Sequence, residues 1–300
     1  MREHVIEENA IRIDAYLAKV IPDLSRSYAA SLIAQGNIRV DGKIVKPSYK
    51  AGKGSILSID LPEPKPMRTC PEDIPLDIFY EDEDLLVINK PQGMVVHPAP
   101  GHHSGTLVHA LLFHCMGQLS DINGVIRPGI VHRIDKDTSG LMLAVKNNRA
   151  HEKLAAMIAA HEIVRKYRCI VHGTVDTNSG IIDAPIGRSG SDRRRMVVCE
   201  GGKPSVTRFT VVERFRKGTD LALVLETGRT HQIRAHMTYI GHPPIGDLLY
   251  APKRPKYELS GQALHSCSLS FFHPLSGEKM QFDAPLPEYY TRLIHCLRDE

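Results

Sequence analysis

The sequence predicts an α+β protein with a small N-terminal domain and a larger C-terminal domain, joined by a proline-rich linker. The chain has 300 residues, which is enough for two separate cores. Four prolines lie within the ten residues from Pro62 to Pro71, a density that interrupts both helices and central strands. After them, apolar strand-like runs alternate with helical spacing and show no internal repeat. We therefore expect domains at 1–62 and 76–300, with the linker at 63–75.

The first domain begins with a pattern typical of two short helices. Ile11, Leu17 and Val20 have the spacing of the apolar side of one amphipathic helix. Ser25 is placed to cap a second helix, because a serine side chain accepts a hydrogen bond from the first turn. Gly36 would end that helix, since glycine readily adopts the left-handed conformation of a helix C-terminus.

A hairpin and a series of further elements follow. Residues 37–45 alternate around the pair Asp41-Gly42, which favours a type I′ turn. In the larger domain, apolar runs predict strands at 85–89, 129–131, 141–145, 167–171, 206–212 and 221–225. Helical spacing predicts one helix at 149–163 and another from Thr230, as its cap, to Tyr239, with Gly241 as its stop.

The charged residues are segregated along the chain, although the net charge is only +4. Between Arg26 and Lys53 six basic residues accompany one acid, and between Arg127 and Arg168 nine accompany four. Arg193, Arg194 and Arg195 form a third basic cluster. This distribution suits a polyanionic partner held on one surface. Each cluster taken alone is equally typical of an ordinary solvated face.

Several classes of protein lack support in the sequence. No apolar run approaches the roughly 20 residues that span a bilayer. The N-terminus has acidic residues where a signal peptide has its apolar stretch, so we expect a cytoplasmic protein that does not contact membranes. The six cysteines form no C-x-x-C pair, and no histidine pair has metal-site spacing, so no metal is expected. Phosphate-binding, dinucleotide and esterase motifs are also missing.

Two segments concentrate ionisable side chains. The loop 132–140, His-Arg-Ile-Asp-Lys-Asp-Thr-Ser-Gly, lies between two predicted strands, and its basic neighbours favour the charged form of Asp135. The segment 225–236 places Arg229, His231 and Arg234 at the start of a predicted helix, where free N–H groups attract anions. His231 and Arg234 are three residues apart, so both can reach one pocket. A surface turn and an ordinary capped helix remain the alternatives for the two segments.

The first domain resembles the S4 RNA-binding domain. The similarity is carried by Arg12-Ile-Asp with Leu17, Ser25-Arg-Ser27, Leu32-Ile with Gly36, and Val40-Asp-Gly42. The remainder resembles the RluA family of pseudouridine synthases, of the RluC/RluD type that carries an N-terminal S4 domain. Four motifs in family order carry this resemblance: Val87-Ile-Asn-Lys-Pro91 with Gly93 and His97-Pro98; Gly129–Gly140; Lys166-Tyr167; and Thr227–His236 with Gly246-Asp247.

The resemblance implies a fold, an activity and a set of site residues. The larger domain is expected to be a mixed, mostly antiparallel sheet with flanking helices. Asp135 is implied as the essential catalytic residue, Tyr167 as the residue that stacks on the target uracil, and Arg234 as the partner of Asp135. Asp137 is not the catalytic acid in this interpretation. RNA contacts are expected, from the charge pattern and the resemblance together, at Arg26, Arg39, Lys43, Arg133, Lys136, Arg193, Arg194, Arg195, Arg229 and His231.

The implied reaction isomerises uridine to pseudouridine, for which the target base must leave its stack. No electrons or external atoms are consumed, so no cofactor is expected. Asp135 could attack the sugar, attack the base or remove a sugar proton. Large-subunit (23S) ribosomal RNA or a ribosomal precursor particle is the expected partner of a monomeric enzyme. Transfer RNA is the alternative substrate, and a catalytically idle RNA-binding or ribosome-assembly factor is the alternative class.

Overall fold

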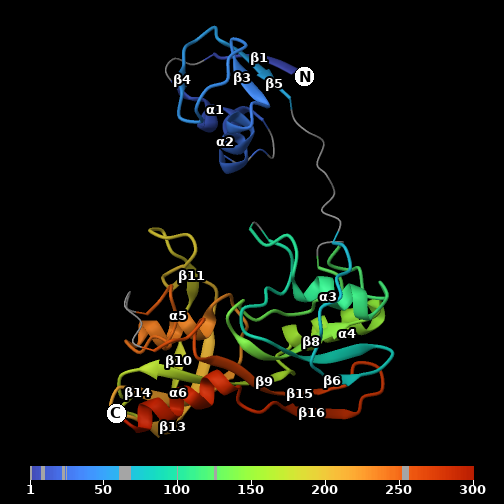
Figure 1. The fold of residues 1–300 in the computed structure, drawn as a ribbon, viewed down its shortest axis with the longest axis vertical. Coiled ribbons are helices and arrows are strands. Elements are labelled where there is room, and N and C mark those ends of the chain that lie inside the picture. Colours follow the sequence, from blue (N-terminus) through green and yellow to red (C-terminus); the bar gives the residue numbers. More distant parts are fainter. Residues whose placement is uncertain are drawn as a thin grey trace. The chain divides into compact units, whose positions relative to one another are not determined.

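The computed structural model describes residues 2–7, 11–21, 24, 26–60, 69–99, 101–124, 127–251 and 257–300, with the backbone alone at 2, 11, 27 and 28 (Figure 1). The chain divides into two compact units, residues 1–67 and 68–300. Pro64 and Pro66 of the predicted linker, and the predicted cap Ser25, lie outside the described residues. No helix of the described residues is long and apolar enough to cross a membrane.

The first unit packs two helices against small antiparallel sheets. Strands β1 (Arg2–Val5), β5 (Ile56–Ile59) and β3 (Ile38–Val40) form one sheet in that order, and β2 (Ile11–Arg12) pairs with β4 (Lys50–Ala51). Helices α1 (Ile13–Val20) and α2 (Arg26–Ala34) bury Leu17, Leu32 and Ile33 against Leu57 of β5. Because Ile11 belongs to β2, its assignment to the first helix was wrong.

Two turns of the first unit follow from particular glycines. Gly36, at φ 77°, ends α2, and the N–H groups of Gly36 and Asn37 donate to the carbonyls of Ile33 and Leu32. Asp41 and Gly42 both have positive φ and form the predicted tight turn. The predicted second strand at 43–45 was wrong, because after a single bridge at Lys43 the chain departs and β5 pairs with β3 instead.

The second unit is built around one large mixed sheet. Its path is β10-β13-β14-β9-β15-β8-β7-β6, and β16 pairs with β15 beside this path. All pairs are antiparallel except β8 with β15, so the predicted mixed, mostly antiparallel sheet is confirmed. The strands are β6 (Ile78–Glu81), β7 (Leu85–Lys90), β8 (Ser139–Val145), β9 (Val164–His172), β10 (Ser179–Asp183), β13 (Val206–Arg214), β14 (Gly218–Leu225), β15 (Leu264–Phe272) and β16 (Lys279–Asp283).

Helices cover both faces of this sheet. Alternate residues of β7 point to opposite faces: Leu86 packs in the cluster that includes α3 (Leu107–His114), and Leu85 in the cluster that includes α4 (Asn148–Ala159). Helix α6 (Glu288–Arg298) packs on the part that contains β9, and a small hairpin of β11 (Ile186–Arg188) and β12 (Met196–Val198) packs on α5 (Gln232–Tyr239).

Two predicted elements of this unit differ from the structure. Residues 129–131 do not form a strand, because only Ile130 makes a bridge to β8 and the ring Nε2 of His132 accepts the N–H of Leu143 in place of a backbone carbonyl. Helix α5 begins at Gln232 without Thr230 as its cap. His231, in the left-handed conformation at φ 55°, precedes the helix.

Candidate active site

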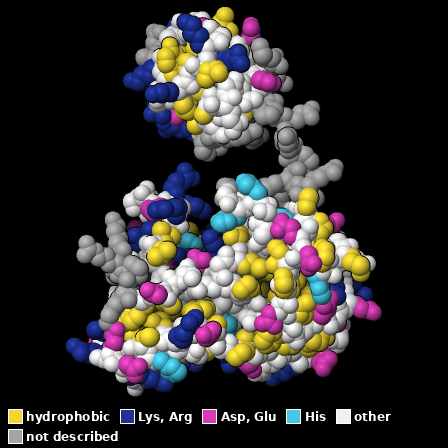
Figure 2. Space-filling view, viewed as in Figure 1, with side chains coloured by type: hydrophobic (Ala, Val, Ile, Leu, Met, Phe, Trp, Pro, Cys, Tyr) yellow, Lys and Arg dark blue, Asp and Glu magenta, His cyan; other side chains and the backbone are white. Residues whose placement is uncertain are grey.

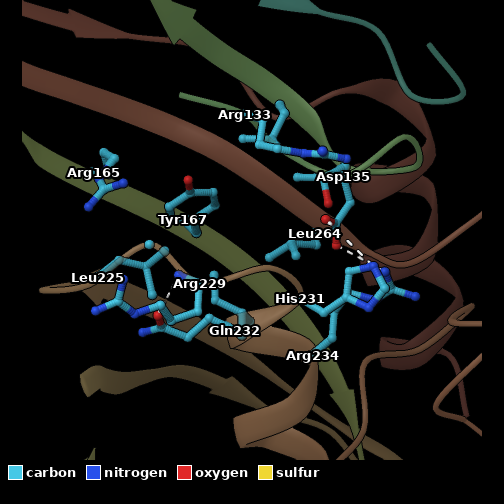
Figure 3. Close-up of a pocket in the computed structure, with 14 residues that line it drawn as sticks. Arg133, Asp135, Arg165, Tyr167, Leu225, Arg229, His231, Gln232, Arg234 and Leu264 are labelled. Carbon is cyan, nitrogen blue, oxygen red and sulfur yellow. Dashed lines mark hydrogen bonds and ion pairs between the residues drawn. The ribbon is translucent and has the colours of Figure 1, made fainter. Parts of the chain in front are cut away.

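Side chains from several segments distant in sequence line one pocket of the second unit (Figure 3). The loop before β8 contributes Arg133, Asp135 and Thr138. Strand β9 contributes Arg165 and Tyr167, and the segment from the end of β14 into α5 contributes residues 225, 228, 229 and 231–234. The predicted catalytic residues Asp135, Tyr167 and Arg234 therefore line the same pocket.

Arg234 joins two carboxylates at the floor of this pocket. Its Nη1 donates to Asp135 Oδ2 at 2.9 Å, and its Nε and Nη2 donate to the two oxygens of Asp247 at 2.7 and 2.9 Å. The Asp247 side chain is fully buried, whereas that of Asp135 is 17% exposed. Burial lowers the pKa of Arg234, but the hydrogen bonds and charges of Asp247 and Asp135 raise it by more. Asp135 thus presents its carboxylate to the pocket beside a permanent cation.

The aromatic ring of Tyr250 packs against the guanidinium of Arg234. The guanidinium carbon of Arg234 lies 4.9 Å from the centre of the Tyr250 ring, and that of Arg195 lies 5.0 Å from it. The hydroxyl of Tyr250 accepts the N–H of Met196 at 2.7 Å and lies 3.0 Å from His231 Nδ1. The start of β12 is thereby tied to the residue that holds Asp135.

His231 lies beside the same carboxylate. Its Nε2 is 3.9 Å from Asp135 Oδ1. Burial lowers the pKa of His231, although the charge of Asp135 opposes this, which favours a neutral ring near pH 7. Its left-handed backbone conformation costs about 1–2 kcal/mol in a non-glycine residue. Such strain is common where a side chain is aimed at a functional site.

Gln232 fixes the loop that carries these residues. Its Oε1 accepts from the Thr227 hydroxyl at 2.7 Å and from the Arg229 N–H at 3.0 Å. Its Nε2 donates to the Val206 carbonyl and the Thr207 hydroxyl, both at 3.0 Å. The amide thus joins the 227–231 loop to β13 and places the start of α5 against the pocket.

Tyr167 forms a buried aromatic wall of the pocket. It projects from the middle of β9, is 5% exposed, and lies between Arg165 and Asp135 in the view of Figure 3. Burial raises the pKa of its hydroxyl, so the phenol stays neutral at physiological pH. A neutral ring beside a carboxylate can stack on a base, an interaction worth about 1–3 kcal/mol.

The residues expected to contact RNA are distributed over both units. In the first unit Arg39 and Lys43 are exposed, whereas Arg26 lies 3.3 Å from the buried carboxylate of Asp14. In the second unit Arg133, Arg229 and His231 line the pocket, and Lys136 is exposed but is not among its lining residues. Arg193, Arg194 and Arg195 belong to the β11–β12 hairpin. Figure 2 shows lysine and arginine side chains gathered at the end of the second unit that carries β11.

Sequence reasoning did not assign roles to Asp247, Tyr250, Gln232 or Arg165, all of which shape the pocket. Asp247 was visible as part of the Gly246-Asp247 motif, and Gln232 as part of Thr227–His236. Tyr250 follows Asp247 by three residues, which is a weak signal. Nothing in the local pattern distinguishes Arg165 from the neighbouring basic residues.

One group of side chains elsewhere has the composition of a metal site. Ligand atoms of Asp82, Asp84 and His273 lie within 4.8 Å of one another. However, Asp82 Oδ1 already accepts two backbone N–H groups, and its Oδ2 accepts the Tyr80 hydroxyl. Both Asp82 oxygens are therefore already used in hydrogen bonds that stabilise the local structure. None of the three residues lines the pocket.

Comparison with known proteins identifies the class. A family model for RNA pseudouridylate synthase matches residues 84–239, slightly more than half of the chain, and an S4 domain model matches residues 11–57. The chain belongs to the RNA pseudouridylate synthase family and is an isomerase that acts on RNA, with an N-terminal S4 RNA-binding domain.

Relatives share almost the whole chain. The uncharacterized RNA pseudouridine synthase YlyB of Bacillus subtilis is 50% identical over 97% of this chain and 96% of its own. Ribosomal large subunit pseudouridine synthase D of Zymomonas mobilis is 46% identical over 95% of this chain and 93% of its own. The human RNA pseudouridylate synthase domain containing 1 has the same fold, with a TM-score of 0.58 at 24% identity over 80% of this chain and 98% of its own.

Proposed function

We propose that this enzyme converts specific uridines of large-subunit ribosomal RNA to pseudouridine, with Asp135 as its catalytic residue. The observation that carries the proposal is the Asp135 carboxylate, held at 2.9 Å by Arg234 in a pocket whose wall is Tyr167. In the reaction the bond from ribose C1′ to uracil N1 breaks, a bond from C1′ to C5 forms, the C5 proton leaves, and N1 takes up a proton. The atoms balance within the nucleotide, so the enzyme has to supply a carboxylate, a surface for the detached base and a dry pocket.

Each of the three residues has a separate task in this proposal. Asp135 acts on the nucleotide as an ionised carboxylate. Arg234 orients Asp135 through the contact of its Nη1 with Asp135 Oδ2. Tyr167 stacks on the uracil and keeps it in the pocket while it turns from N1 to C5.

The choice of ribosomal RNA is supported by several relatives. Proteins named ribosomal large subunit pseudouridine synthase D, from Zymomonas mobilis and Pseudomonas aeruginosa, are 46% and 43% identical over nearly the whole chain. Mapping pseudouridines in total RNA from cells that lack the gene tests the substrate directly. We expect sites missing from large-subunit ribosomal RNA, and sites missing from transfer RNA alone would contradict the proposal.

The catalytic assignment is tested by Asp135→Asn, with Asp137→Asn as its matched control in the same loop. Asp137 is not among the residues that line the pocket. Turnover should fall at least about 10³-fold in Asp135→Asn and stay near wild type in Asp137→Asn, while RNA affinity stays similar in both. Tritium release from RNA labelled at uracil C5 measures the reaction. Substantial turnover in Asp135→Asn would contradict the role of Asp135.

A further inference from the structure

Arg165 is a buried arginine without a counter-charge. It is 6% exposed, its Nε has no hydrogen-bond partner, and its side chain makes no hydrogen bond or ion pair with any residue that the structure describes. Two other arginines of this unit with little exposed surface do have a carboxylate partner: Arg234 pairs with Asp247 and Arg168 with Asp220. A buried charge without a partner costs several kcal/mol, so a partner from outside the chain is the natural explanation for its retention.

Arg165 lies where two hollows meet. It lines the pocket of Asp135 and Tyr167, and also an adjoining hollow of about 430 Å³ formed largely by Val131–Arg133, residues 158, 159 and 161, and the segment Thr227–Arg229. Arg133, Gly228 and Arg229 line both spaces as well. The second hollow has three arginines among its lining residues and no aspartate or glutamate. Its chemistry therefore suits an anion.

Because Gly228 has no side chain, the guanidinium of Arg165 can occupy the space beside it. A Cβ at position 228 would lie 2.7 Å from Arg165 Nη1, so any other residue would displace the arginine. The neighbouring ring of His132 does not provide Arg165 with a counter-charge, because it is neutral. Its Nε2 accepts a backbone N–H, and burial, with a smaller contribution from Arg165, lowers its pKa to about 3. The guanidinium of Arg165 therefore has a defined space beside Gly228, but no carboxylate balances its charge.

We propose that Arg165, with Arg133 and Arg229, forms a subsite for an RNA phosphodiester beside the target nucleotide. Arg165 and Tyr167 are two residues apart on β9, so their side chains share one face at a spacing of roughly 7 Å. When the uracil stacks on Tyr167, the sugar–phosphate backbone of the same nucleotide lies close to Arg165. This inference rests on the proposed function, because it takes the uridine to lie between Tyr167 and Asp135.

The test compares Arg165→Met and Arg165→Lys with a control, Arg298→Met. Arg298 is an arginine of the same unit that pairs with Glu213 on the surface and is not among the pocket residues. The full chain is titrated with a short single-stranded oligouridylate at several potassium chloride concentrations. Each phosphate contact to a single strand contributes about 0.7 to the slope of log K against log salt. Melting temperatures and steady-state turnover on ribosomal RNA complete the measurements.

We expect Arg165→Met to weaken binding about tenfold or more, as for a lost hydrogen bond to a charged group, and to reduce the salt slope by about 0.7. Arg165→Lys should keep most of the slope, and Arg298→Met should keep all of it. Because an unpaired buried charge is removed, the melting temperature of Arg165→Met should be equal to that of wild type or higher.

An unchanged slope in Arg165→Met would overturn the subsite, as would an equal loss in Arg298→Met. A lowered melting temperature with an unchanged slope would assign Arg165 to the fold instead. If wild type makes no pseudouridine in ribosomal RNA but the slopes still differ, the proposed substrate fails and the phosphate subsite stands.

Discussion

At the scale of single residues, the orientation of Arg234 is fixed by Asp247 and does not depend on Asp135. Two of its nitrogens are held by Asp247, whose Oδ1 also accepts the N–H groups of Leu249 and Tyr250. Only the remaining Nη1 is directed at Asp135. The buried Asp247 carboxylate therefore acts as a fixed anchor, and Asp135 meets a guanidinium whose orientation is already set.

Lys90 holds the loop of Asp135 from its other side. Its fully buried ammonium donates to the carbonyls of Pro91, Met94 and Lys136, and the Lys136 carbonyl also accepts the N–H of Gly93. Burial lowers the pKa of Lys90 to about 7, although nearby carboxylates oppose this shift. A lysine of the unfolded chain titrates near about 10.4.

This difference predicts how stability depends on pH. Above pH 7 the folded protein loses the Lys90 proton while the unfolded chain retains it, so the unfolded state binds more protons and the free energy of unfolding rises with pH. Relative to Lys90→Met, the wild-type value should rise by up to about 1.4 kcal/mol per pH unit until about pH 10. Denaturant unfolding followed by circular dichroism measures it, since the chain has no tryptophan. Parallel curves for the two proteins would contradict the prediction.

At the scale of elements, the parallel contact of β8 with β15 places the Asp135 loop. The register joins Ser139 to His265 and Gly140 to Ser266. Gly140 has φ 113°, and a Cβ there would overlap the backbone of Ser266. The strand that follows the Asp135 loop thus packs against β15 so closely that only glycine fits.

We expect Gly140→Ala to destabilise the second unit by about 2–4 kcal/mol, through overlap and backbone strain together. Gly93→Ala is the matched control. Gly93 also has positive φ, but a Cβ there meets no atom within 4 Å, so strain alone should cost about 1 kcal/mol. Thermal unfolding of both variants separates the two contributions. Equal losses of stability in the two variants would show that the close approach of Gly140 to β15 does not add to the cost of the substitution.

The β11–β12 hairpin connects a basic surface to Arg234, which lines the pocket. The hairpin carries Arg195 and Met196, and both contact Tyr250, whose ring packs on Arg234. An RNA backbone that moves this hairpin would therefore act on the residue that orients Asp135.

At the scale of the whole molecule, the Asp135 pocket and the S4 domain belong to different units. The Asp135 pocket is built entirely from the second unit, and Arg39 and Lys43 are exposed on the first. Deleting residues 1–67 should weaken RNA binding and reduce its salt slope by about 0.7 for each lost phosphate contact. Binding titrations at several salt concentrations, with turnover at saturating RNA, measure both effects. Unchanged affinity would remove the S4 domain from substrate binding, and complete loss of turnover at saturation would contradict the separation of tasks.

Much of this protein was determined by the sequence alone. The strands from Leu85 to Lys90 and from Ser139 to Val145, the turn at Asp41-Gly42 and the S4 and synthase motifs all depend on neighbours in the chain, so local patterns predicted them. Predictions failed where contacts with residues distant in the sequence determine the local structure. Residues 129–131 look like a strand, but a histidine side chain takes over part of the pairing, and the start of α5 is set by contacts of Gln232 with β13.

Only the tertiary structure decided the geometry of the pocket. Asp135 and Arg234 are 99 residues apart in the chain, and no local pattern states that they meet at 2.9 Å. Asp247 and Tyr250 act through Arg234, and Arg165 differs from its basic neighbours only in being buried without a counter-charge. The physical reason is that an ion pair or an unpaired charge is a relation between elements, which exists only after the sheet has brought them together.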